Sequence, residues 1–199
     1  MIEITNLKVS FPSISFQFTD FVFPKNKITL ITGRNGTGKT TLLKAVANLI
    51  NYDGDIQIGG FVTYNSQEPT LFNRTVYENI IYPLKIRNYN TEDYISKINE
   101  YCELLSIHHL LDQNALKLSS GEKMKVSILR SLIFNPDVVL LDEPTTYLDL
   151  ESISELIHLI KRLKTTVTFI IVSHNKFFVD ELADHTYHLG GSNVYRKTN

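Results

Sequence analysis

Eight consecutive residues, Gly33 to Thr40, have the types and spacing needed to hold phosphate groups. They read Gly-Arg-Asn-Gly-Thr-Gly-Lys-Thr, follow the apolar run from Ile28 to Thr32, and precede an apolar helical pattern. This strand-loop-helix context is what a phosphate-binding loop requires. Glycines allow the sharp turn that presents backbone N–H groups to phosphate oxygens, and the helix that follows adds its positive end. A chance glycine-rich turn of this kind is expected in about one chain in a hundred or fewer.

Two side chains of this loop have separate tasks. Lys39 can contact the β- and γ-phosphates as a point charge, and the Thr40 hydroxyl is placed to ligate Mg²⁺. The sequence contains no N-K-x-D element to read guanine, which argues against a GTPase. The candidate nucleotide-binding residues of the loop are Gly33, Arg34, Asn35, Gly36, Thr37, Gly38, Lys39, Thr40 and Thr41.

Two carboxylates, Asp142 and Glu143, end a continuous apolar run from Val138 to Leu141. Such a run predicts a buried parallel strand. Asp142 is placed to hold the Mg²⁺ shell, and Glu143 is placed to polarise an attacking water. An acidic pair at a strand end is also a common surface feature, but the upstream loop favours the catalytic interpretation.

Two further polar residues follow predicted strands. Gln67 follows the strand-like stretch from Phe61 to Asn65, and His174 follows the stretch from Thr168 to Ser173. Ligands bind at the carboxyl edge of parallel sheets, so we expect both side chains near the phosphates. His174 would contact the γ-phosphate and position water near Glu143, and the Gln67 amide would coordinate Mg²⁺ or water. The alternatives are a structural histidine and a polar turn residue.

The segment from Leu118 to Glu122 lies between the phosphate-binding loop and the acidic pair. Ser119, Ser120 and Gly121 come directly before a predicted helix, so they form a second helix N-terminus that can bind an anion. The alternative is that these residues only cap the helix and bind no anion. The helix itself is predicted from the spacing of Val126, Leu129 and Ile133.

Taken in order, these motifs resemble those of the nucleotide-binding subunits of ATP-binding cassette (ABC) proteins. The resemblance extends from about Ile2 to Leu189. The Leu118–Glu122 segment resembles the L-S-G-G-Q signature, and Asp142–Asp149 resembles the Walker B motif, catalytic glutamate and D-loop. Gln67 then corresponds to the Q-loop glutamine and His174 to the switch histidine.

The resemblance implies an α/β fold: a P-loop NTPase core with a mostly parallel sheet, an N-terminal antiparallel β subdomain and an inserted helical signature subdomain. We expect a single domain over residues 1–199, with the helical part at about 69–134. The implied cofactors are ATP and Mg²⁺. The expected catalytic residues are Glu143, His174 and Gln67, and the expected metal ligands are Thr40, Gln67 and Asp142.

In the family, the signature of one subunit caps the γ-phosphate held by a second ABC subunit. This implies that Ser119, Ser120, Gly121 and Glu122 contact ATP across a dimer interface, and that Asp149 lies at the dimer centre. Ser120 stands where the family usually has Gly, and Glu122 where it has Gln. Glu122 brings negative charge near a nucleotide, which weakens affinity or dimer closure. A homodimer and a heterodimer both remain open.

Adenine needs a flat apolar contact, and the resemblance implies Phe11 for this role because the family has a stacking aromatic in this early loop. The alternative is a partly buried loop aromatic. Ile14, Phe16 and Phe18 alternate as strand residues do, so we expect Phe16 and Phe18 to face the core.

Composition limits the other partners. The chain has 199 residues, a formal net charge of −1 and no basic run, so we expect no nucleic-acid partner. The only cysteine, Cys102, excludes an intramolecular disulfide, and no signal peptide is visible, so we expect a cytoplasmic chain. No run approaches the roughly 18 apolar residues that span a bilayer.

We therefore expect an ATP-hydrolysing subunit, peripheral on the cytoplasmic face of the cell membrane, that powers a separate transmembrane subunit through ATP-driven dimer closure. The stretch from Leu71 to Ile80 resembles one in exporter cassettes, beside which a coupling helix of the membrane subunit docks. Phe72, Arg74 and Tyr77 are then candidates for contact, with ordinary core or surface placement as the alternative. A soluble ABC ATPase acting as an assembly or regulatory factor would share every motif. An unrelated P-loop kinase would need an acceptor site and an arginine-rich lid instead of the signature.

Overall fold

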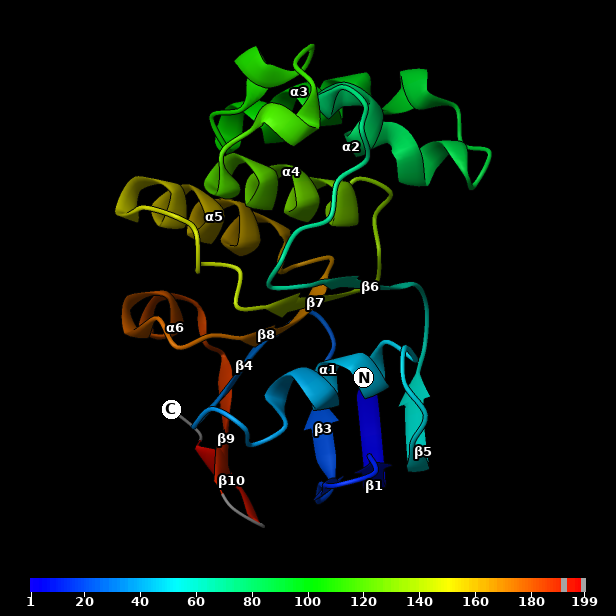
Figure 1. Cartoon of the computed structure of the whole chain (residues 1–199), viewed down its shortest axis with the longest axis vertical. Coiled ribbons are helices and arrows are strands. Elements are labelled where there is room, and N and C mark those ends of the chain that lie inside the picture. Colours follow the sequence, from blue (N-terminus) through cyan, green and yellow to red (C-terminus); the bar gives the residue numbers. More distant parts are fainter. Residues whose placement is uncertain (191–192, 198–199) are drawn as a thin grey trace.

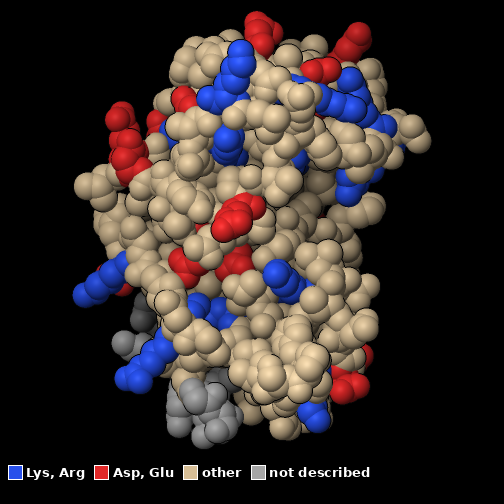
Figure 2. Space-filling view, in the orientation of Figure 1, with Lys and Arg blue, Asp and Glu red and all other residues tan. Residues whose placement is uncertain are grey.

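The computed structural model describes residues 1–190 and 193–197. A cluster of helices occupies one end of the molecule, and a larger sheet extends from the middle to the other end, where a small antiparallel sheet also lies (Figure 1). On the face shown in Figure 2, Lys and Arg side chains are scattered among Asp and Glu, and several acidic side chains lie near the centre.

The larger sheet has the strand order β10-β9-β4-β8-β7-β6. Neighbouring strands are parallel except for β10 and β9. The central strands β4, β7 and β8 are almost wholly buried, which explains their continuous apolar runs. The strands are β4 (Ile28–Gly33), β6 (Val62–Asn65), β7 (Val138–Asp142), β8 (Thr168–Val172), β9 (His185–Gly190) and β10 (Asn193–Lys197).

The smaller sheet is antiparallel and is built around β1, which pairs with each of the other three strands. It packs with the helix α1 (Lys39–Val46) over one face of the larger sheet. Its strands are β1 (Ile2–Ser10), β2 (Ser15–Gln17), β3 (Phe21–Phe23) and β5 (Asp53–Ile58).

The remaining helices cover the opposite face and extend away from it (Figure 1). Those between β6 and β7 are α2 (Val76–Lys85), α3 (Ile95–Leu104) and α4 (Ser120–Leu132), joined through the 3₁₀ turns η1 (Thr91–Tyr94), η2 (His108–Leu110) and η3 (Ala115–Lys117). The helices α5 (Leu150–Leu163) and α6 (Lys176–Leu182) follow β7 and β8. The predicted fold class is therefore confirmed.

Alternate residues of β7 pack on the two faces of the larger sheet. Val139 and Leu141 belong to the core on the side of α2 to α5, whereas Val138 and Leu140 belong to the core with α1 and the smaller sheet. By this alternation, Asp142 lies on the α1 side. Among the described residues, no helix is both long enough and apolar enough to cross a bilayer.

The signature helix α4 is tied to its neighbours by a partly buried ion pair. Lys125 Nζ lies 2.7 Å from Glu155 Oε2 on α5, and the Ser106 hydroxyl, just after α3, donates to the same carboxylate. These contacts fix α4 relative to α3 and α5.

Candidate nucleotide-binding site

The loop between β4 and α1 needs glycine at two positions for steric reasons. Gly33 has φ +143°, and a Cβ there would lie 2.2 Å from the carbonyl oxygen of Leu189 on β9. Gly38 has φ +89°, and a Cβ there would lie 2.7 Å from the Phe16 ring. Both positions combine the left-handed backbone region with close packing, so no larger residue fits without a shift.

Lys39 is held inside this loop. It is only 7% exposed, and its Nζ donates to the carbonyl oxygens of Gly33 at 2.9 Å and Arg34 at 3.0 Å. Burial lowers the pKa of Lys39, and the nearby carboxylates of Glu143 and Asp142 oppose that decrease. The loop therefore carries a fixed cationic group beside two acidic ones.

A cavity of about 560 Å³ joins the loop to the carboxyl ends of the parallel strands. It brings together the loop, the predicted catalytic residues and the predicted metal ligands, which come from four separate parts of the sequence. The residues that line it are Phe16, Asn35, Gly36, Gly38, Lys39, Thr40, Thr41, Gln67, Asp142, Glu143, Thr146, Val172 and His174.

Glu143 and His174 form a paired unit in this cavity. The Nε2 atom of His174 lies 3.3 Å from Glu143 Oε1, and the backbone N–H of His174 donates to Oε2 at 3.1 Å. Glu143 has φ +49°, and its N–H donates to the carbonyl of Val172 at 2.9 Å. A non-glycine residue in this region carries strain of about 1–3 kcal/mol. The surrounding bonds hold the carboxylate in one orientation.

Asp142 has two oxygens with different surroundings. The residue is 2% exposed, and its Oδ2 accepts a hydrogen bond from Tyr64 Oη at 3.1 Å, whereas Oδ1 is buried without a partner among the described residues. Burial and the Asp142 carboxylate raise the pKa of Tyr64, so its hydroxyl stays protonated and donates. With Thr40 and Gln67 in the same cavity, the unpartnered oxygen completes a set of hard oxygen donors that suits Mg²⁺.

The signature residues lie elsewhere. Ser119 caps α4, its N–H and hydroxyl both donate to Glu122 Oε2 at 2.8 Å, and the Glu122 N–H donates back to Ser119 Oγ. Asp149 caps α5 by accepting from the Ser152 N–H at 2.8 Å. Ser119, Ser120, Gly121, Glu122 and Asp149 are all absent from the lining of the nucleotide cavity in the described residues.

Replacing Ser119 by Ala removes the side-chain cap and is expected to lower the free energy of unfolding by about 1 kcal/mol at neutral pH. Hydrogen bonds from Ser119 lower the pKa of Glu122 from 4.5. Their stabilisation is therefore present above pH 4.5 and is lost as pH falls through the lowered pKa. Urea unfolding of Ser119→Ala and Ser120→Ala, compared across the acid range, checks this. An equal loss in both variants would contradict the assignment.

Three aromatic residues, Phe11, Phe16 and Phe18, lie in or near the turn between β1 and β2. Phe18 is buried as predicted. Phe16 is partly buried and packs against the same core, as expected, and it also lines the nucleotide cavity beside Gly38. Phe11 is 43% exposed at the β1–β2 turn and meets Phe16 edge-on, with ring centroids 6.3 Å apart. Strand alternation predicts the packing of Phe16 and Phe18 on the core but not the contact of Phe16 with the loop.

Tyr64 and Thr146 are further site residues that sequence reasoning missed. Tyr64 lies three residues before Gln67, and Thr146 lies within the Asp142–Asp149 segment. The position of Tyr64 opposite Leu140 depends on the pairing of β6 with β7. The sequence offers no local signal for that pairing.

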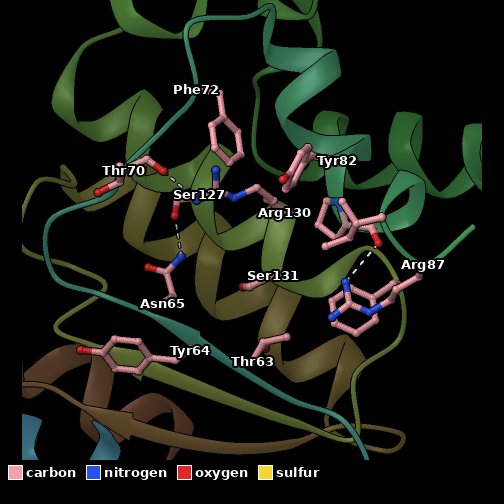
Figure 3. Close-up of a pocket in the computed structure, with 13 residues that line it drawn as sticks. Thr63, Tyr64, Asn65, Thr70, Phe72, Tyr82, Arg87, Ser127, Arg130 and Ser131 are labelled. Atoms are coloured by element: carbon pink, nitrogen blue, oxygen red, sulfur yellow. Dashed lines mark hydrogen bonds between the residues drawn. The ribbon is translucent and has the colours of Figure 1, made fainter. Parts of the chain in front are cut away.

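A second cavity, of about 430 Å³, lies on the other side of β6, between that strand, α2 and α4. Figure 3 shows Phe72, Tyr82 and Arg130 grouped at its upper part and Arg87 farther along. Arg130 donates to the carbonyl of Thr70 at 2.7 Å and lies 5.6 Å from the Phe72 ring centre, while Arg87 lies 4.0 Å from that of Phe134. We call this cavity the α2–α4 groove. Its lining residues are Thr63, Tyr64, Asn65, Thr70, Phe72, Tyr82, Pro83, Ile86, Arg87, Ser127, Arg130, Ser131 and Phe134.

Of the three predicted contact residues in this region, only Phe72 lines the groove. The guanidinium of Arg74 lies at its edge, 5.9 Å from the ring centres of both Phe72 and Tyr82. Tyr77 is partly buried against the helical core.

The fold and the cavity define a P-loop nucleotide hydrolase. The family model described as ABC transporter matches residues 16–146, and the chain belongs to this family. It is an ATP-binding and ATP-hydrolysing subunit of an ABC transporter.

Comparison with individual proteins agrees with this assignment. The chain is 34% identical to the tungstate uptake system ATP-binding protein TupC of Peptoclostridium acidaminophilum, over 97% of this chain and 96% of that protein. It is 36% identical to the probable iron export ATP-binding protein FetA of Escherichia coli, over 79% and 76% of the two chains. A solved dimeric ATP-binding cassette, in a post-hydrolysis state with ADP and phosphate, has the same fold with a TM-score of 0.87 at 20% identity, over 100% of this chain and 98% of that one.

Proposed function

We propose that this chain pairs with a second ABC subunit, closes around two Mg²⁺-ATP molecules, and thereby drives a separate transmembrane subunit. The observation that carries the proposal is the position of Ser119 and Gly121. They form the exposed N-terminal end of a thirteen-residue helix but do not line their own nucleotide cavity. This helix end meets a nucleotide that is held by the loop of a second chain. With two-fold pairing, the helix end of the second chain meets the nucleotide of the first in the same way.

The chemistry proposed for the cavity is in-line attack of water on the γ-phosphate. Glu143 accepts the proton of the attacking water as general base, and its bonds to His174 hold the carboxylate in place. Lys39 stabilises negative charge on the β- and γ-phosphates, and the Ser119 helix end of the partner adds further positive potential. Thr40, Gln67 and Asp142 would hold Mg²⁺, which neutralises phosphate charge when bound.

Energy transfer follows from contacts that exist only in the closed pair. ATP favours closure because both the loop of one chain and the signature of the other bind it, and hydrolysis with phosphate release removes those contacts. The dimeric cassette of the same fold with ADP and phosphate supports this cycle. The names of the relatives describe both uptake and export.

We place the docking surface for the membrane subunit at the α2–α4 groove. Exposed apolar side chains border it, including Phe72 at 41% and Ile86 at 58% exposure. Its charged lining residues are Arg87 and Arg130, and neither forms an ion pair with a carboxylate within residues 1–190. An amphipathic segment that carries a carboxylate complements such a surface. Docking there makes this chain peripheral on the cytoplasmic face of the membrane.

The test is to express a tagged Glu143→Gln chain in its native cell, separate membrane from cytosol, and identify what co-purifies with ATP present. A polytopic membrane protein at stoichiometric level is the expected result. Recovery only in the cytosol with soluble partners would overturn the docking proposal and favour an assembly or regulatory factor.

Replacing Ile86 by Asp in the tagged chain is expected to reduce recovery of the membrane subunit at least tenfold, because it places a charge in the apolar border of the groove. A tenfold loss corresponds to about 1.4 kcal/mol of binding free energy. ATP binding by the isolated chain should be unchanged, since Ile86 lies outside the nucleotide cavity. Ile95→Asp is the matched control, because Ile95 is 46% exposed on α3 and away from the groove lining. Equal recovery with both variants would contradict this docking surface.

A further inference from the structure

We infer that Tyr64 is a positioning residue that orients the Asp142 carboxylate for its Mg²⁺ ion. The inference rests on the proposed role of Asp142 as a metal ligand. It assigns a function to a tyrosine outside all of the motifs that marked the site in the sequence.

The strand register places Tyr64 beside Asp142. β6 and β7 are parallel, and Tyr64 pairs with Leu140, two residues before Asp142. Residues two apart on a strand point to the same face, so Tyr64, Leu140 and Asp142 all lie on the α1 side of the sheet. The Tyr64 hydroxyl therefore reaches Asp142 Oδ2, to which it donates at 3.1 Å.

This bond gives the two carboxylate oxygens different tasks. Oδ2 is occupied by Tyr64, while Oδ1 is buried and has no protein partner among the described residues. Asp142 also lines the nucleotide cavity. A partner on one oxygen prevents rotation of the carboxylate and directs the other oxygen to the ion, and loss of such a partner typically costs about 10- to 100-fold in metal affinity.

The same strand also forms a wall of the α2–α4 groove. Asn65, which faces away from Tyr64, donates to Ser127 Oγ on α4 at 2.8 Å, and both residues line the groove. Figure 3 shows Asn65 directed toward Ser127 and the Tyr64 ring lying on the other side of the strand. The position of β6 therefore sets both the groove wall and the orientation of Asp142.

The experiment measures binding of Mn²⁺, as a spectroscopic substitute for Mg²⁺, to the purified full chain with the non-hydrolysable ATP analogue AMP-PNP. Electron paramagnetic resonance reports free Mn²⁺, and fluorescence competition in EDTA reports metal-free affinity for AMP-PNP. The variants are Tyr64→Phe and Asp142→Asn. Tyr187→Phe is the matched control, because its hydroxyl donates to the carbonyl of Val22 at 3.0 Å in the same core but does not contact Asp142.

We expect Tyr64→Phe to weaken Mn²⁺ binding about tenfold, with metal-free affinity within about twofold of wild type and no effect of Tyr187→Phe. Mn²⁺ binding equal to wild type in Tyr64→Phe overturns the inference. The inference is also overturned if Tyr64→Phe loses as much affinity for AMP-PNP in EDTA as it loses for Mn²⁺, because the hydroxyl would then support the loop and not the ion. If Asp142→Asn also binds Mn²⁺ as wild type does, the metal assignment of Asp142 fails instead.

Discussion

Replacement of Glu143 by Gln is expected to slow ATP hydrolysis by about 10²- to 10⁴-fold, the range that a positioned general base contributes. The amide keeps the shape of the side chain but cannot accept the proton of the attacking water. ATP binding should be retained, because Lys39 and the backbone of the loop are unchanged. Phosphate release measured at saturating ATP, together with nucleotide affinity from fluorescence titration, separates the two effects.

The control for this exchange is Glu92→Gln, which makes the same chemical change at an exposed position on η1. Its hydrolysis rate should equal that of wild type. If Glu143→Gln hydrolysed ATP at the wild-type rate, the general base would have to be a different group. A variant that lost ATP binding and hydrolysis together would show that Glu143 supports the loop and not the chemical step.

Replacement of Gly33 by Ala is expected to lower the free energy of unfolding by about 2–3 kcal/mol and to weaken ATP binding at least tenfold. The new Cβ would lie 2.2 Å from the carbonyl oxygen of Leu189. That oxygen belongs to the backbone of β9, which pairs with β4 at this point, so it cannot move away as a flexible side chain would. The loop must shift, and its N–H groups lose their alignment.

Gly36→Ala separates this clash from the cost of the backbone conformation. Gly36 has φ +80°, but a Cβ there meets no atom within 4 Å, so only the left-handed conformation is penalised, at about 1–2 kcal/mol. Urea unfolding of both variants without nucleotide measures the difference. A loss in Gly36→Ala as large as in Gly33→Ala would show that contact with β9 is unimportant.

The parts of this protein that the sequence predicts well are those with local causes. The loop around Lys39, the buried strand before Asp142 and the helix after Ser119 each follow from neighbouring residues. The loop and the end of the Asp142 strand meet at one edge of the sheet because the strands are parallel, so Gln67 and His174 were also expected in the cavity where the structure places them. The left-handed backbone of Glu143 has no local signal, because it depends on the bond from its N–H to Val172 on the next strand.

Side-chain partners across strands are the part that the sequence does not predict. Tyr64 meets Asp142 only because β6 pairs with β7 in one register. Phe16 lies at the nucleotide cavity because the smaller sheet folds against Gly38. Glu122 stands where the family usually has Gln, and the structure gives this residue a role, because its carboxylate completes the capping box of α4. It thereby places a negative charge at the helix end proposed to meet a phosphate.

Gly121 lies close to the D-loop. A Cβ there would lie 2.9 Å from the carbonyl oxygen of Tyr147, two residues before Asp149. The segment proposed to touch the nucleotide of the partner is thus in backbone contact with the segment that leads to Asp149. Gly121 itself has no side chain that could separate its backbone from the Tyr147 carbonyl. A movement of the segment at Gly121 therefore displaces the segment at Tyr147 directly. In a closed pair, the two nucleotide sites would then be coupled through this rigid backbone contact and not through mobile side chains.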